Sequence, residues 1–245
     1  FDTFEQAQSV LRNLRGGYDT QGRSYYFGAL QGVSAFGEGR LAEYDENIKR
    51  DVARLNARRP DPIQLKYFQY LAALYTEHYL AQRASNPTAL VQEVNRFART
   101  IGMGATFTLS DFNKVAYWMA TGSGKTLLLH LNYYQFLRYS GNDPGDNVLL
   151  ITPPGELLAA QHREEMRLSS IASLSFDEAL PIGSAHPVRV VEISKLTRDK
   201  KGGGVSLDVE GFEGRNLLFV DEGHKGTKGN GEAAWRDLRA QLGKD

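Results

Sequence analysis

The feature that most limits how this chain can fold is a short polar loop, which consists of Thr121, Gly122, Ser123, Gly124, Lys125 and Thr126. It follows an apolar run at residues 115–119, which is predicted to be a strand, and precedes a run at 127–137 whose apolar residues recur at helical spacing. A glycine turn between a strand and a helix is the setting of a phosphate-binding loop. The sequence therefore predicts an α/β domain that binds a nucleoside triphosphate.

Each residue type in this loop has a chemical task. Glycines let the backbone curl around phosphate oxygens with N–H groups pointing inward, and the N-terminus of the next helix adds its positive dipole end. We expect Lys125 to reach the β- and γ-phosphates of ATP and Thr126 to offer its hydroxyl to Mg²⁺. The general pattern has glycine where this chain has Met119. The alternative is a chance glycine-rich turn, which the agreement of strand, turn, Lys-Thr pair and helix disfavours.

A second apolar run, residues 217–220, ends directly in Asp221 and Glu222. A buried parallel strand would present these carboxylates at its C-terminal edge, where ligands bind in open α/β sheets. We expect Asp221 to hold Mg²⁺, through water, and Glu222 to orient and polarise an attacking water. Alone, such a pair can equally be a helix cap or a turn. The phosphate loop upstream favours the ATPase interpretation.

The rest of the chain divides into two kinds of pattern. Before about residue 110 it is predicted to be mostly helical, with helices at 40–59, 62–83 and 87–101 and an irregular segment or short hairpin at 22–39. That segment contains the aromatic residues Tyr25, Tyr26 and Phe27. They either belong to the core or an interface, or stack against the bases of a nucleic acid. Afterwards apolar runs at 148–152, 188–193 and 217–220 alternate with helices, which favours a parallel sheet covered on both faces.

Charge and cysteine content narrow the function classes. Lys+Arg and Asp+Glu both number 29, so the net charge of +0 gives no support to nucleic-acid binding by a broad basic field. The count of 0 Cys excludes disulfides and Cys-ligated metals within these residues and fits a reducing cytoplasm. No apolar run approaches the ~20 residues of a membrane span. We expect a cytoplasmic protein without a membrane partner and, because the chain begins at Phe1, a piece of a longer one.

The motifs resemble those of a known group of motor proteins. Residues 221–224, Asp-Glu-Gly-His, match the DExH box of superfamily 2 helicases, and residues 119–126 resemble motif I of that superfamily. The loop is most similar to that of type III restriction enzyme Res subunits and related bacterial defence helicases, in which Met119 is usual. The resemblance implies an ATP-dependent helicase or translocase acting on nucleic acid, with DNA favoured. It also implies that His224 couples the ATP state to a second motor half.

Two further segments acquire roles through the same resemblance. Residues 151–158 with Gln161 and His162 resemble motif Ia, which contacts the nucleic-acid backbone, and N–H groups at a helix start suit phosphate. The alternative is a plain strand–helix connection. An upstream glutamine reads adenine in this superfamily, and Gln69 is the candidate, unless it is only a polar position on a helix. The implied nucleic-acid contacts are Thr152, Pro153, Pro154, Gly155 and Gln161.

The resemblance also sets the expected domain organisation. We expect a helical accessory region at 1–61 and the first RecA-like P-loop NTPase domain at 62–245, with a helical insertion at about 85–110 and an end before motif III. The second RecA-like domain and its arginine finger are absent from this chain, so the fragment alone should hydrolyse ATP weakly. Subunits of a defence complex are possible partners. The rival interpretation is a P-loop ATPase that acts on protein or serves as a regulatory subunit.

Overall fold

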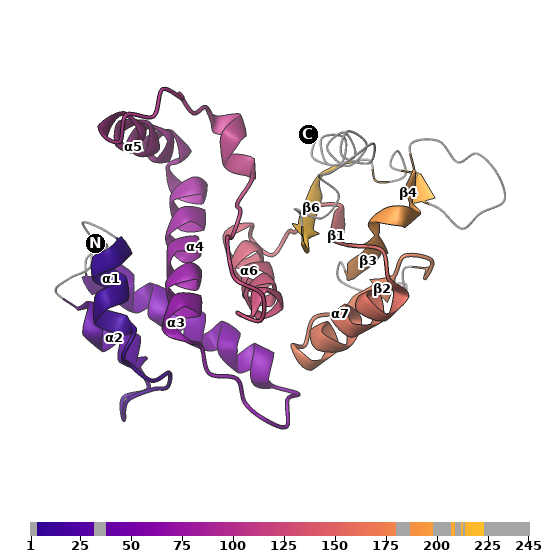
Figure 1. Cartoon of the computed structure of the whole chain (residues 1–245), viewed down its shortest axis with the longest axis horizontal. Coiled ribbons are helices and arrows are strands. Elements are labelled where there is room, and N and C mark those ends of the chain that lie inside the picture. Colours follow the sequence, from indigo (N-terminus) through magenta and orange to yellow (C-terminus); the bar gives the residue numbers. More distant parts are fainter. Residues whose placement is uncertain are drawn as a thin grey trace. The chain divides into compact units, whose positions relative to one another are not determined.

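The computed structural model describes residues 4–31, 38–179, 187–197, 207–208, 212 and 214–222. The chain divides into two compact units, residues 1–53 with 62–142 and residues 54–61 with 143–245 (Figure 1). Residues 200–204 and 223–245 lie outside the described residues. The domain boundary expected at residue 61 stays a prediction.

The described part of the first unit is built from helices, and residues 54–56 at the end of α3 belong to the second unit. Helix α4 packs against both α5 and α6. Asn86 separates α4 from α5: its side chain accepts a hydrogen bond from Ala89 N at 3.1 Å, and Pro87 occupies the first helical position. The elements are α1 (Phe4–Leu11), α2 (Tyr25–Leu30), α3 (Glu38–Asn56), α4 (Tyr67–Ser85), α5 (Pro87–Thr100), η1 (Leu109–Asn113) and α6 (Lys125–Tyr139).

A buried ionic cluster joins three of these helices. Arg138 of α6 contacts Asp51 of α3 through Nη2 and Oδ2 at 2.6 Å, and it also pairs with Glu77 of α4. Both carboxylate side chains are 0% exposed. Burial raises the pKa of Glu77, and Arg138 counters this only in part. Because removing one partner would leave a buried charge uncompensated, this cluster fixes how α3, α4 and α6 pack.

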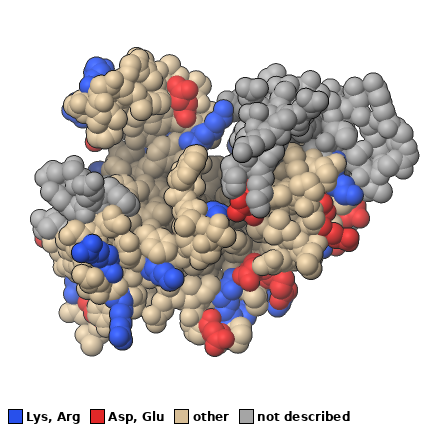
Figure 2. All heavy atoms as spheres, viewed as in Figure 1, with Lys and Arg blue, Asp and Glu red and all other residues tan. Residues whose placement is uncertain are grey.

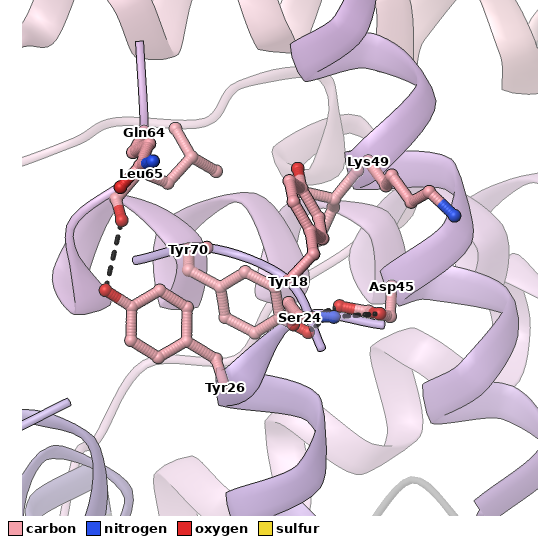
Figure 3. A pocket seen from close by; sticks show the side chains of 10 residues that line it. Tyr18, Ser24, Tyr26, Asp45, Lys49, Gln64, Leu65 and Tyr70 are labelled. Carbon is pink, nitrogen blue, oxygen red and sulfur yellow. Dashed lines mark hydrogen bonds between the residues drawn. The ribbon is translucent and has the colours of Figure 1, made fainter. Parts of the chain in front are cut away.

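The segment predicted to be irregular, residues 22–39, contains a short helix instead. Ser24 caps α2 by accepting from Phe27 N at 3.0 Å, and Ser24 N donates in turn to the Asp45 carboxylate at 3.1 Å. Tyr26 OH donates to Leu65 O at 3.0 Å, as Figure 3 shows. Tyr26 and Phe27 are buried, which makes them core residues and not base-stacking platforms, whereas Tyr25 is half-exposed.

The second unit contains the parallel sheet that the sequence predicts. Its order is β2-β3-β1-β6, every neighbouring pair is parallel, and α7 packs against β2 and β3 (Figure 1). Leu149, Ile151 and Val191 form the centre of an apolar cluster that also includes Leu218 and Val220. The elements are β1 (Asn147–Thr152), α7 (Glu156–Leu168), β2 (Ser173–Ser175), β3 (Val188–Glu192), η2 (Ile193–Lys195) and β6 (Asn216–Val220), with a separate pair of β4 (Leu196–Thr197) and β5 (Leu207–Asp208).

Residues 54–61 belong to the second unit because side chains tie them to α7. Arg59 Nη2 donates to Glu165 Oε2 at 2.8 Å and to Ser169 Oγ at 3.0 Å. The guanidinium of Arg59 therefore joins the end of the α3 segment to the C-terminal half of α7.

The strand predicted at residues 115–119 is wrong. This run has no regular secondary structure and pairs with no strand in the described ranges of the chain. Val115 is 51% exposed and Trp118 100% exposed, while Tyr117 hydrogen-bonds through its hydroxyl to Thr76 of α4. The run is thus held by a side chain on a helix and not by a backbone ladder.

Candidate nucleotide and nucleic-acid site

The phosphate loop has the backbone geometry that its sequence predicts. Gly122 and Gly124 have φ angles of 74° and 88°, in the left-handed region that favours glycine. Ser123 N donates to Ala120 O at 3.2 Å, which closes the turn, and α6 begins at Lys125. Thr121 is exposed, and residues 123–126 are half-buried at the helix N-terminus. The loop therefore offers a curled backbone and a helix start to an anion.

Gln69 lies against this loop, and both ends of its amide are engaged. Its Nε2 donates to Ser123 O at 2.8 Å, and its Oε1 accepts from Lys66 N at 2.8 Å. The side chain is buried, and a Cβ at Gly124 would collide with its amide nitrogen. The family resemblance predicts that this glutamine recognises adenine, and this stays a prediction. The structure adds a contact that the sequence did not suggest, between the glutamine and the loop backbone.

The acidic pair lies at the carboxyl end of β6. Asp221 N donates to Ile151 O at 3.0 Å, which extends the pairing of β6 with β1 by one hydrogen bond. The Asp221 side chain is 15% exposed. Glu222 has a φ of 50°, in a region where residues with a side chain are uncommon. The backbone of Asp221 is thus fixed by the sheet, whereas the backbone of Glu222 turns away from the direction of the strand.

A histidine that the sequence placed in the motif Ia resemblance, and not in the nucleotide site, approaches Asp221. His162, on α7, places Nε2 3.1 Å from Asp221 Oδ2, and the imidazole is only 3% exposed. Because these residues are 59 positions apart, no local pattern could signal the contact.

The predicted nucleic-acid segment connects β1 to α7. Pro154, Gly155 and Gln161 are exposed, whereas Thr152 is 1% exposed. At this helix start, Gly155 N donates to Glu192 Oε2 at 2.9 Å. A carboxylate at the end of β3 therefore occupies the place that a phosphate would take at that N–H.

Within each unit, the structure brings some of the predicted residues together. Gln69 joins the loop in the first unit, while Asp221, Glu222 and the β1–α7 connection share the second unit. His224 lies outside the described residues. Within the described part, no three His, Cys, Asp or Glu side chains gather as metal ligands.

The parallel sheet, the phosphate loop that opens α6 and the acidic pair after β6 define a RecA-like P-loop domain. The chain belongs to the family described as type III restriction enzyme, res subunit, whose profile matches residues 78–244. It is accordingly an ATP-dependent, helicase-like motor domain. No curated protein and no solved structure shows a significant match. None of the helices in the described ranges has both the length and the hydropathy of a membrane-spanning helix.

Proposed function

We propose that this chain is the ATP-binding half of a motor that translocates on or unwinds double-stranded DNA in a bacterial restriction or phage-defence system. The observation that carries the proposal is the pairing of β1 with β6, from Asn147↔Asn216 to Ile151↔Val220. One strand leads into the predicted nucleic-acid segment and the other into the acidic pair. A shared ladder is a direct physical route between nucleic-acid contact and ATP cleavage.

The roles of the nucleotide site follow from the chemistry of each group. Lys125 and the N–H groups at the start of α6 bind the phosphates, and Thr126 and Asp221 hold Mg²⁺. The cation supplies charge neutralisation to the phosphates when it is bound. Glu222 accepts the proton of the attacking water. Gln69 holds the loop in place and is also the candidate for adenine recognition. His224 completes the DExH box and is assigned the coupling of ATP state to the second motor half.

The nucleic-acid contacts are assigned to Thr152, Pro153, Pro154, Gly155 and Gln161. Figure 2 shows both basic and acidic side chains on the face in view. This agrees with the net charge of +0 and leaves phosphate binding to backbone groups and a few side chains. DNA is proposed over RNA because the family is named for a restriction enzyme.

The test is ATP hydrolysis by the full-length protein, alone and with duplex DNA, single-stranded DNA or RNA. Lys125→Ala is the blank, and Lys114→Ala, an exposed lysine of the same unit, is the matched control. We expect duplex DNA to stimulate turnover and Lys125→Ala to lower it by about 10²-fold or more, because it removes a charge aimed at the transferring phosphoryl group.

Two outcomes would contradict the proposal. Normal turnover by Lys125→Ala would exclude the loop as the ATP site. Robust turnover that is indifferent to every nucleic acid would instead support the rival P-loop ATPase that acts on protein or regulates another subunit.

A further inference from the structure

His162 is a buried polar residue on the inner side of α7. Its side chain is 3% exposed, and the next buried residue along the helix, Met166, is apolar and 0% exposed. A buried polar group destabilises a core unless it is hydrogen-bonded, so an apolar residue would serve packing at this position at least as well. The imidazole therefore calls for an explanation other than packing.

The contact that His162 makes has a defined direction. A carboxylate only accepts hydrogen bonds, so the Nε2 atom 3.1 Å from Asp221 Oδ2 must carry the proton and donate. The other ring nitrogen, Nδ1, is buried and has no hydrogen-bond partner among the described residues. The single polar contact resolved for the imidazole is thus the one to Asp221.

Two contacts that fix Asp221 are resolved. Its backbone N donates to Ile151 O at the end of β1, and its Oδ2 accepts from His162 of the following helix. The first contact sets where the residue leaves the sheet. The second sets the rotation of the carboxyl group and occupies one of its two oxygens.

We infer that His162 is a positioning residue for Asp221, whose hydrogen bond to Oδ2 fixes the orientation of the carboxylate that is proposed to serve the Mg²⁺ of bound ATP. The inference rests on the proposed function, because it assumes that Asp221 serves that cation. It adds a residue of the predicted nucleic-acid helix α7 to the nucleotide chemistry. It also gives α7 a contact through which a movement of that helix reaches the cation.

The size of the effect can be anticipated from metal sites in general. Residues that hydrogen-bond a metal-binding side chain typically contribute about 10–100-fold to metal affinity. Since Asp221 is expected to bind through water, the lower end of this range applies. Loss of the His162 hydrogen bond should therefore weaken Mg²⁺ by about tenfold.

The test compares three variants in the full-length protein. His162→Phe keeps a ring but removes the N–H, and His162→Gln restores an N–H donor at similar reach. Met166→Ala opens a cavity in the same helix without touching Asp221, so it controls for lost stability. The probe is a fluorescent ATP analogue, whose binding is measured in EDTA and then across a Mg²⁺ titration, together with the melting temperature of each variant.

We expect His162→Phe to raise the half-saturating Mg²⁺ concentration by about tenfold with unchanged binding in EDTA. His162→Gln should recover most of this loss, and Met166→Ala should lower the melting temperature without moving the Mg²⁺ midpoint. Equal midpoints for His162→Phe and Met166→Ala would overturn the inference while leaving the proposed function intact. A wild-type protein that does not bind the analogue at all would overturn the proposed function and this inference together.

Discussion

Two segments of this chain have the same pattern, an apolar run followed by residues for phosphate chemistry, and they are positioned by different means. Residues 216–222 follow a backbone ladder, because β6 pairs with β1 over its whole length and Asp221 N adds one more hydrogen bond. Residues 115–126 are positioned by side chains of α4, because Thr76 contacts Tyr117 and Gln69 donates a hydrogen bond to the carbonyl of Ser123.

The difference shows what an apolar run can and cannot specify. An apolar run of this length predicts a segment whose side chains are buried. A strand also needs a partner strand, and the whole fold, not the run itself, determines whether one is present. The acidic pair therefore depends on sheet packing, and the phosphate loop depends on the helical scaffold. The following variants separate these two dependences.

The largest expected effect on stability lies in the sheet. Leu149 is 1% exposed at the centre of β1, so Leu149→Ala should lower the free energy of unfolding by about 2–5 kcal/mol through lost burial and a cavity. Trp118→Ala in the run at 115–119 should change it by less than about 0.5 kcal/mol, because that side chain is 100% exposed. Urea unfolding followed by circular dichroism measures both. A large loss for Trp118→Ala would show that the run is buried after all.

The next effect concerns the helical hold on the loop. Gln69→Ala leaves the Ser123 carbonyl and the Lys66 N–H without this partner, so ATP affinity should fall by about 5–10-fold, in line with a net ~1 kcal/mol for a lost hydrogen bond. Binding of ATP and GTP separates the two roles assigned to Gln69. An equal loss for both nucleotides indicates loop positioning, whereas a loss confined to ATP indicates adenine recognition.

The smallest effect is a pH dependence of the scaffold that carries the loop. Burial raises the pKa of Glu77 above its ordinary 4.5, so the folded protein binds this proton more tightly than the unfolded chain. Its contribution to stability is complete below the ordinary pKa and is lost as the pH rises through the folded-state pKa. The unfolding free energy of Glu77→Gln relative to wild type should therefore shift in favour of the variant as the pH rises above 4.5.

The control for this pH series is Glu46→Gln, which alters an exposed glutamate on α3. It should track the wild type across the same range in urea unfolding. If Glu77→Gln shows no pH-dependent difference from the wild type, then the folded-state pKa of Glu77 is not raised.

Sequence reasoning was most successful where a pattern is local. Helical spacing predicted α3 and α5, and apolar runs predicted β1, β3 and β6. Helix α4 was predicted to begin too early, because residues 62–66 have no regular secondary structure before Tyr67. The short elements α2 and β2 were missed because six and three residues carry no period.

The candidate site divides in the same way. The loop at Thr121–Thr126 and the pair Asp221–Glu222 could be read directly, because each is a contiguous string whose residue types suit one task. The contacts of Gln69 with Ser123 and of His162 with Asp221 could not, because they join residues 54 and 59 positions apart. The occupation of the Gly155 N–H by Glu192 is likewise a product of tertiary packing.

The left-handed backbone at Glu222 has a consequence for anyone who engineers this protein. A residue with a side chain is less stable in that conformation than glycine by roughly 1–2 kcal/mol, and asparagine tolerates it better than most. A library selected only for heat resistance would thus drift toward glycine or asparagine at this position. Each variant selected in this way would lack the carboxylate on which ATP cleavage is proposed to depend. A screen for thermostability should therefore also measure ATP hydrolysis for variants at this position.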